Sequence, residues 1–183
     1  NPSEKLKLIA DEFLGVAELT GDVVDLGSCR GGTAYVLRQL APHKHLHLVD
    51  TWVGNPHDDS LCHHKRGEWV ASLDDCRRLV GTGELTHYHQ GVFPELNSDD
   101  CHNDNSRPLD ENTFCFIYVY MDTYKSTRYA IDFLWPRLVP GGKMMFDDWK
   151  WNPCAGVEKA VREVFTDNQI KEFPLLYTCI MTK

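Results

Sequence analysis

Short apolar runs that stop at glycine or aspartate recur along this chain, and segments of helical periodicity separate them. The strongest is 114–121, where aromatic and β-branched residues end at Asp122. A short apolar run bounded in this way is typical of a strand that is buried on both faces. Strands that alternate with helices are joined by crossover connections, which place the strands parallel in one sheet. The sequence therefore predicts an α/β fold with a mostly parallel sheet, in which ligands bind beyond the carboxyl ends of the strands.

The predicted elements alternate from one end of the chain to the other. Helices are predicted at 6–17, 33–40, 69–80, 126–138 and 155–165, and strands at 23–26, 45–50, 85–90, 114–121, 143–146 and, as a pair, within 169–182. Residues 97–112 are almost wholly polar, which predicts a long surface loop. Because no repeat or linker interrupts this order, residues 1–183 are interpreted as one domain.

The composition excludes several classes of protein. The chain has 183 residues, 42% of them apolar, and a formal net charge of -8. At this length roughly 70% of the unfolded chain's surface is buried on folding, so neither disulfides nor a metal are needed for stability. The negative charge argues against binding to nucleic acid, and the longest apolar run is too short to span a membrane. Seven cysteines without a Cys-x-x-Cys pair indicate reduced thiols and a cytoplasmic location.

Aspartates lie at or just beyond the ends of four predicted strands. They are Asp25, Asp50, Asp122 and the pair Asp147-Asp148. Because the carboxyl ends of parallel strands meet at one edge of a sheet, these side chains are expected to gather there. Clustered carboxylates repel one another and lose hydration when buried, so such a cluster favours a ligand with hydroxyl groups, a positive charge or a divalent metal. The alternative is that each aspartate caps the helix that follows its strand.

A glycine-rich turn joins the first predicted strand to the next helix, with the sequence Asp25-Leu26-Gly27-Ser28-Cys29-Arg30-Gly31-Gly32-Thr33. Glycines allow a tight turn and the close approach of a ligand to the helix N-terminus. A dinucleotide fingerprint would have glycine where Cys29 stands, which weakens a pyrophosphate site. The turn favours a nucleoside without phosphates, whose ribose hydroxyls Asp50 would bind. A structural turn, or a different nucleotide-using enzyme such as a dehydrogenase, stays an alternative.

Four segments, taken in order, resemble the motifs of the macrocin O-methyltransferase family, a branch of the class I S-adenosylmethionine-dependent methyltransferases. The first is 21–34, which contains the glycine turn, and the next two are 49–54 and 90–96. The longest runs from Tyr120-Met121-Asp122-Thr123-Tyr124-Lys125-Ser126-Thr127 to Phe146-Asp147-Asp148-Trp149. The resemblance covers nearly the whole chain. It implies a Rossmann-like fold with seven strands, helices on both faces and an antiparallel C-terminal strand.

The resemblance also implies a binding site for S-adenosylmethionine, with Asp50 on the ribose and Gln90 or Gly91 near the adenine. The expected cofactor-binding residues are Asp25, Gly27, Ser28, Cys29, Gly31, Thr33, Asp50, Thr51, Gln90 and Gly91. Enzymes of the family methylate hydroxyl groups on sugars of natural products. The expected partner is therefore a small-molecule hydroxyl acceptor, with no nucleic acid and no membrane. The sequence leaves the identity of the acceptor, and the choice between monomer and homo-oligomer, open.

Several members of the family use Mg²⁺, held by an aspartate of the fourth strand and an acidic pair after the fifth. The resemblance places Asp122, Asp147 and Asp148 at such a site, although Tyr120 stands where the family has its first acidic ligand. Asp122 is expected to take the proton of the acceptor hydroxyl or to bind the metal. Lys125 is the alternative base, unless it is a solvated residue at the start of its helix. Tyr120 also favours a second interpretation, a methyltransferase-like module that binds the cofactor without catalysis.

Two further groups of residues invite a functional interpretation. Cys62-His63-His64 and Cys101-His102 have side chains that bind zinc. Their spacing matches no standard zinc site, and exposed loop positions explain them more simply. Trp149 and Trp151 follow the acidic pair, where they either line an acceptor pocket or pack beneath a loop.

Overall fold

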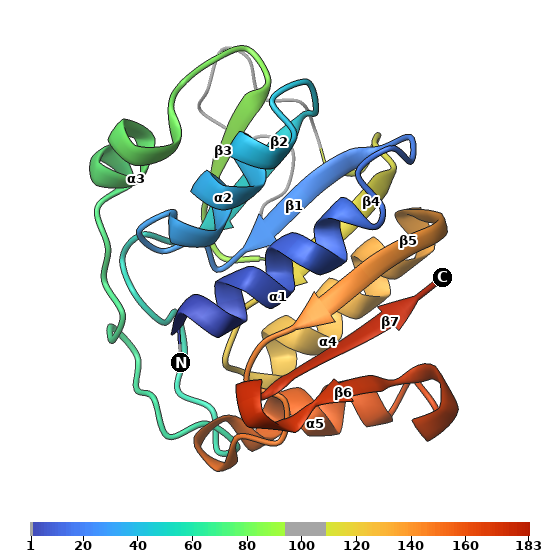
Figure 1. Ribbon diagram of the computed structural model, residues 1–183. Helices are drawn as coiled ribbons and strands as arrows, with labels where there is room; N and C mark the ends of the chain where they lie inside the picture. The colour runs from blue at the N-terminus through green and yellow to red at the C-terminus, as the bar shows by residue number, and fades with distance from the viewer. Residues whose placement is uncertain (1, 94–108) are drawn as a thin grey trace.

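The computed structural model of the protein describes residues 2–93 and 109–183. Within these ranges, the centre of the molecule is a seven-stranded sheet with the order β3-β2-β1-β4-β5-β7-β6 (Figure 1). The strands are β1 (Asp22–Leu26), β2 (Leu46–Asp50), β3 (Thr86–Gln90), β4 (Phe114–Val119), β5 (Leu138–Phe146), β6 (Lys171–Phe173) and β7 (Thr178–Thr182). Strands β1 to β5 are parallel, and β7 is antiparallel to both of its neighbours. The predicted fold class is confirmed, including the antiparallel C-terminal strand.

Helices cover both faces of this sheet. On the face seen from the front in Figure 1 lie α1 (Pro2–Leu14), α2 (Gly32–Leu40) and α3 (Leu73–Val80), and behind it lie α4 (Tyr124–Leu134) and α5 (Ala155–Arg162). Single 3-10 turns are at Trp135–Arg137, Asn152–Cys154, Asp167–Gln169 and Pro174–Leu176. Neighbouring residues of one strand point to opposite faces, so Val23 packs in the core with Phe13 of α1, and Val24 packs in the core with Ile131 of α4. Because both faces are covered, the central strands β1 and β4 are mostly apolar in the sequence.

Several element boundaries differ from the prediction; α1 spans residues 2–14 rather than 6–17, and β5 begins at Leu138 rather than at residue 143. The helix predicted at 69–80 begins at Leu73, because Ser72 caps it by accepting a hydrogen bond from the amide of Asp75. Val70, which the helical pattern placed inward, is 61% exposed. The helix predicted at 126–138 ends at Leu134, where a proline-containing 3-10 turn leads directly into β5. The strand predicted at 114–121 ends at residue 119. The loop predicted at 97–112 lies outside the described residues except for its last four.

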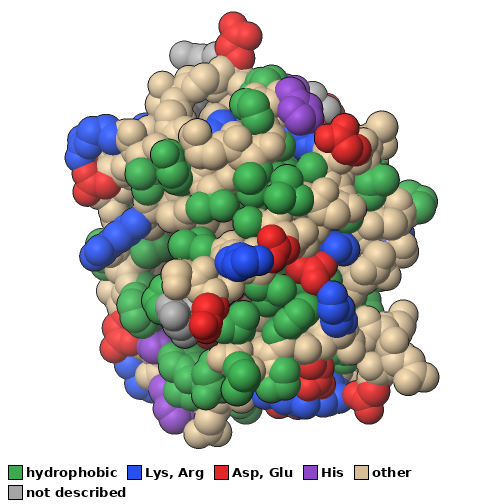
Figure 2. Space-filling model, viewed as in Figure 1, with side chains coloured by type: hydrophobic (Ala, Val, Ile, Leu, Met, Phe, Trp, Pro, Cys, Tyr) green, Lys and Arg blue, Asp and Glu red, His purple; other side chains and the backbone are tan. Residues whose placement is uncertain are grey.

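The surface carries charges of both signs. On the face in Figure 2, acidic and basic side chains are interspersed with apolar ones. Ion pairs such as those of Glu12 with Lys143 and Lys171 account for part of this pattern. A continuous basic patch, which the backbone phosphates of nucleic acid need, is not visible on this face. Among the described residues, no helix has the length and apolar character needed to cross a membrane.

Candidate active site

The turn after β1 is wedged between the ends of β2 and β4. The amide of Gly27 donates to the carbonyl of Val49 at 2.8 Å, and the amide of Tyr120 donates to the carbonyl of Leu26 at 2.9 Å. Gly27 has a φ of +79°, and a Cβ at this position would lie 1.9 Å from the carbonyl oxygen of Tyr120. Only glycine fits here, because the turn contacts the backbone beyond β4 directly.

Asp50, the last residue of β2, fixes the middle of the turn through hydrogen bonds. Its Oδ2 accepts a hydrogen bond from the amide of Cys29 at 2.8 Å, and its Oδ1 accepts one from the amide of Trp52 at 2.7 Å. The indole Nε1 of Trp52 in turn donates to the carbonyl of Cys29 at 2.9 Å. Each carboxylate oxygen has a second lone pair. Asp50 can therefore hold the turn and still accept hydrogen bonds from two hydroxyl groups of a ligand.

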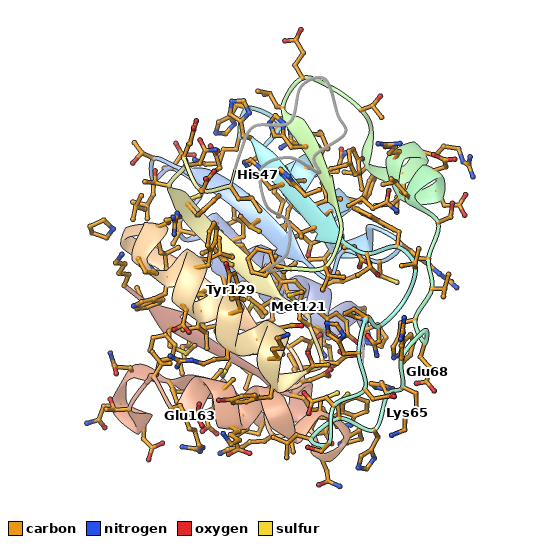
Figure 3. All side chains as sticks on the ribbon, turned by 180° about the vertical axis from the view of Figure 1, so that it is seen from behind. His47, Lys65, Glu68, Met121, Tyr129 and Glu163 are labelled. Atoms are coloured by element: carbon orange, nitrogen blue, oxygen red, sulfur yellow. The ribbon has the colours of Figure 1, made fainter. Side chains whose placement is uncertain are left out.

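Two cavities adjoin this turn, and Gly27, Cys29 and Tyr120 line both of them. The first cavity, of about 280 Å³, lies beyond the carboxyl ends of β2, β3 and β4. Met121, which lines this cavity, is labelled in Figure 3, as are Lys65 and Glu68 of the neighbouring loop. The other residues of the first cavity are Val49, Asp50, Thr51, Gly54, Asn55, Pro56, His64, Trp69, Gly91, Phe93, Asp122, Thr123, Ser126 and Trp151. The second cavity, of about 510 Å³, is lined by α1, the turn and residues 175–177.

The predicted cofactor-binding residues divide between these cavities. The first is lined by Gly27, Cys29, Asp50, Thr51 and Gly91, and the second by Gly27, Ser28, Cys29 and Thr33. Gly31 lies behind the turn, where a Cβ would come within 2.8 Å of the sulfur of Cys76 in α3. Gln90 lines neither cavity, and its exposed side chain donates to the carbonyl of Thr51 at 3.2 Å. The turn and Asp50 thus lie at the cavities, whereas Gly31 and Gln90 support the loops around them.

Asp25 does not lie where the cofactor-binding prediction placed it. It is a residue of β1 beneath the turn, is 1% exposed and lines neither cavity. Burial raises the pKa of Asp25 to about 7.

Asp122 and Asp148 are neighbouring carboxyl groups that burial desolvates and that interact electrostatically. Asp122 lines the first cavity, and Asp148 is 6% exposed behind it. Burial, followed by repulsion from Asp147 and Asp122, raises the pKa of Asp148 to about 8. Burial also raises the pKa of Asp122. A carboxylate whose pKa is shifted toward neutrality is matched to general base catalysis.

Asp147 points away from this pair. One of its oxygens forms an ion pair with Lys5 of α1, and the other accepts a hydrogen bond from the hydroxyl of Tyr118 at 2.8 Å. It lines the second cavity, because successive side chains of an extended segment point to opposite sides. In the described part of the chain, the oxygens of Asp122, Asp147 and Asp148 are not grouped as ligands of one ion. The residues present therefore do not fit the predicted three-carboxylate magnesium site.

The raised pKa of Asp148 predicts a free energy of unfolding that falls as the pH rises. The carboxyl has an ordinary pKa of 3.8 and a pKa of about 8 in the folded protein. The folded state holds the proton more tightly, so this contribution to stability is complete below about pH 4 and is lost as the pH approaches about 8. We expect urea unfolding of Asp148→Asn to show a flatter pH dependence than wild type over this range. Identical slopes for the two proteins would contradict the shift.

Beside Asp122 lies a group that the sequence analysis did not assemble. The sulfurs of Cys62 and Cys154 are 3.8 Å apart, and each lies within 4.8 Å of a carboxylate oxygen of Asp122. Cys62 is 3% exposed, so its predicted place among exposed loop residues is wrong. Cys101-His102 lies outside the described residues. The two cysteines are separated by 92 residues, and the only signal in the sequence is that each follows a strand whose end meets this edge of the sheet.

The remaining predicted residues divide between the surface, the core and the cavity. Lys125 is exposed in the first turn of α4 and lines neither cavity. Trp149 is fully buried in the core, whereas Trp151 lines the first cavity with His64 and Trp69. The ring of His64 lies 5.2 Å from that of Trp69 and 5.8 Å from that of Trp151, between centroids. These three rings form an aromatic wall of the first cavity.

Solved structures of methyltransferases share this fold. The O-methyltransferase NovP matches with a TM-score of 0.73 and 18% identity over 98% of this chain and 78% of NovP. CalS11, a calicheamicin methyltransferase, matches with a TM-score of 0.76 and 14% identity over 98% of this chain and 79% of CalS11. A putative caffeoyl-CoA O-methyltransferase from Staphylococcus aureus matches with a TM-score of 0.65 and 9% identity over 98% of this chain and 82% of that protein. None of the curated proteins matches the sequence significantly.

The family model described as a methyltransferase domain matches residues 24–149. This range contains the glycine turn, Asp50, Asp122 and the acidic pair, and it spans more than half of the chain. The narrower resemblance to the macrocin branch stays a prediction. The chain belongs to this methyltransferase domain family and is a class I S-adenosylmethionine-dependent methyltransferase.

Proposed function

We propose that this enzyme is an O-methyltransferase whose acceptor is a hydroxyl group of a small molecule, of the sugar or natural-product class. The observation that carries the proposal is the position of Asp122. Its desolvated carboxylate lines the same cavity as Asp50 and the turn at Gly27. A proton acceptor therefore lies next to the place where a nucleoside-linked methyl donor would bind.

The residues around the turn fit the parts of S-adenosylmethionine. Asp50 has lone pairs for the ribose hydroxyls, and Gly91 leaves space for the adenine at the end of β3. Gly32 and Thr33, at the start of α2, line the second cavity, and the N-cap residue Gly31 has no side chain with which to cap them. Free amides at a helix N-terminus suit a carboxylate such as that of the methionine moiety. When bound, the donor supplies a methyl carbon that is electrophilic because it is attached to a sulfonium.

Asp122 would accept the hydroxyl proton of the acceptor as the new carbon–oxygen bond forms. The carbon–sulfur bond breaks and its electron pair stays on sulfur, so the products are a methyl ether, S-adenosylhomocysteine and a protonated Asp122. General base catalysis of this kind contributes about 10²–10⁴-fold to the rate. The cavity contributes further by holding the acceptor oxygen close to the methyl carbon and in line with the bond that breaks.

The aromatic wall suits an acceptor with a ring. Faces of His64, Trp69 and Trp151 offer apolar surface against which a sugar or a planar ring would pack. Apo CalS11, which shares the fold, is a TDP-rhamnose 3'-O-methyltransferase.

The test is transfer of a labelled methyl group from S-adenosylmethionine to a panel of glycosides, sugar nucleotides and phenols. We expect label in a product whose methyl group NMR identifies as an ether. Transfer to nitrogen or carbon instead of oxygen would contradict the proposal.

Replacement of Asp50 should weaken binding of the donor. We expect Asp50→Ala to lower the affinity for S-adenosylhomocysteine at least about tenfold, because hydrogen bonds to a charged group contribute about 1.5–3 kcal/mol each. Calorimetry measures this directly. Asp148→Ala, behind Asp122 and outside both cavities, should leave the affinity unchanged and lower turnover. The reverse pattern for the two variants would contradict the assigned roles.

A second candidate function is a module that binds the donor without methyl transfer. Two observations favour it: Tyr120 at the position of the family's first acidic ligand, and the ion pair that engages Asp147. In that case S-adenosylhomocysteine binds, no acceptor gains label, and Asp122→Asn has no functional consequence.

A further inference from the structure

Two segments far apart in the sequence hold Cys62 and Cys154 side by side. Backbone hydrogen bonds of 2.7 and 3.2 Å join residues 61–63 to residues 153–156 on both sides of the thiols. The two cysteines are 3% and 0% exposed. Their separation is therefore fixed by the backbone of the two segments and protected from solvent.

The distance between the sulfurs fits a shared tetrahedral metal. Thiolates bind zinc at about 2.3 Å, so two of them at a tetrahedral angle lie about 3.8 Å apart. The observed distance between the sulfurs of Cys62 and Cys154 is 3.8 Å. Asp122 has an oxygen within 4.8 Å of both sulfurs and would be the third ligand. Zinc accepts two cysteines and a carboxylate, whereas magnesium requires oxygen ligands.

The surroundings of these three side chains favour a cation. Asp148 is 6% exposed, and its Oδ2 has no hydrogen-bond partner among the described residues. Lys5 forms an ion pair with Asp147, and the Nδ1 of His64 lies 3.4 Å from a carboxylate oxygen of Glu68. Both thiols are buried, and a cysteine binds zinc as the thiolate. A bound metal ion would deprotonate them and balance the buried carboxylates.

We propose that Cys62, Cys154 and Asp122 form a binding site for Zn²⁺. Three protein ligands leave a fourth position, which water or an acceptor oxygen would occupy. Asp122 binds the ion through one oxygen, so its second oxygen stays available to the acceptor. The site does not depend on the proposed methyl transfer, because metal binding is measured without donor or acceptor.

The test uses the full chain, stripped of metal by a chelator and then titrated with Co²⁺. Cobalt bound to thiolates gives a sulfur-to-metal charge-transfer absorption and the visible bands of a tetrahedral site. We expect one Co²⁺ per chain, displaced by Zn²⁺ and not by Mg²⁺. Cys62→Ala and Cys154→Ala should each weaken zinc binding more than about 100-fold, beyond the range expected for the loss of an outer-shell group.

Cys179→Ala is the matched control, since Cys179 is a fully buried cysteine of β7 outside the group. Circular dichroism without metal establishes that each variant is folded. If a site variant does not fold, protection of the wild-type thiols from alkylation decides the question, because zinc should shield Cys62 and Cys154 selectively. The proposal is overturned if wild type and the site variants bind zinc with equal affinity, or if Cys179→Ala loses as much zinc affinity as the site variants. The proposal is also overturned if mild oxidation forms a Cys62–Cys154 disulfide equally well with and without zinc.

Discussion

Replacing Asp122 with asparagine should lower kcat by about 10²–10⁴-fold, the range expected for the loss of a general base. The amide keeps the shape of the side chain at the cavity but cannot accept the hydroxyl proton. Asp122 is neither part of the turn nor the residue that would bind the ribose, so the affinity for S-adenosylhomocysteine should be unchanged. Single-turnover methyl transfer and calorimetry measure the two quantities separately.

Lys125→Met is the control for this experiment. Lys125 lies three residues from Asp122, but it is exposed and lines neither cavity. We expect its kcat to equal that of wild type. A loss in Lys125→Met as large as that in Asp122→Asn would make Lys125 the base and contradict the role assigned to Asp122.

The second large effect is expected from Gly27→Ala. The φ of +79° is unfavourable for alanine, and the new Cβ would lie 1.9 Å from the carbonyl oxygen of Tyr120. That carbonyl cannot move freely, because the amide of Tyr120 is bonded to Leu26. Left-handed strain and overpacking together predict a loss of about 3 kcal/mol or more in the free energy of unfolding. Urea unfolding measures the loss, and calorimetry should show that donor binding is lost as well.

Gly32→Ala is the matched control in the same turn. A Cβ at Gly32 meets nothing within 4 Å, and no left-handed φ is required there. Gly32 is the first residue of α2, so alanine should leave stability unchanged or raise it slightly. If Gly27→Ala were as stable as Gly32→Ala, the contact between the turn and Tyr120 would not be the constraint described here.

The fold could be predicted because its signals are local. Apolar runs bounded by glycine and aspartate mark strands buried on both faces, and Asp50 and Asp122 follow such runs directly. The parallel order of the strands then places both residues at one edge. Asp25 differs because its carboxylate lies one residue before the end of β1 and points beneath the turn rather than into a cavity.

The rest of the site depends on contacts between distant segments. Asp147 and Asp148 are equivalent in the sequence, and only the approach of Lys5 and Tyr118 from other elements shows that Asp147 faces the second cavity. Similarly, no periodicity indicates that Cys62 meets Cys154 across 92 residues of chain. Such pairs are determined by how loops pack on the sheet, which a local pattern does not encode.

The most direct test of the account is the crystal structure of the complex with S-adenosylhomocysteine. The account predicts ribose hydroxyls hydrogen-bonded to Asp50, and a sulfur that faces the first cavity on the side of Asp122. A ligand bound elsewhere, or bound at the turn with its sulfur directed away from Asp122, would contradict it.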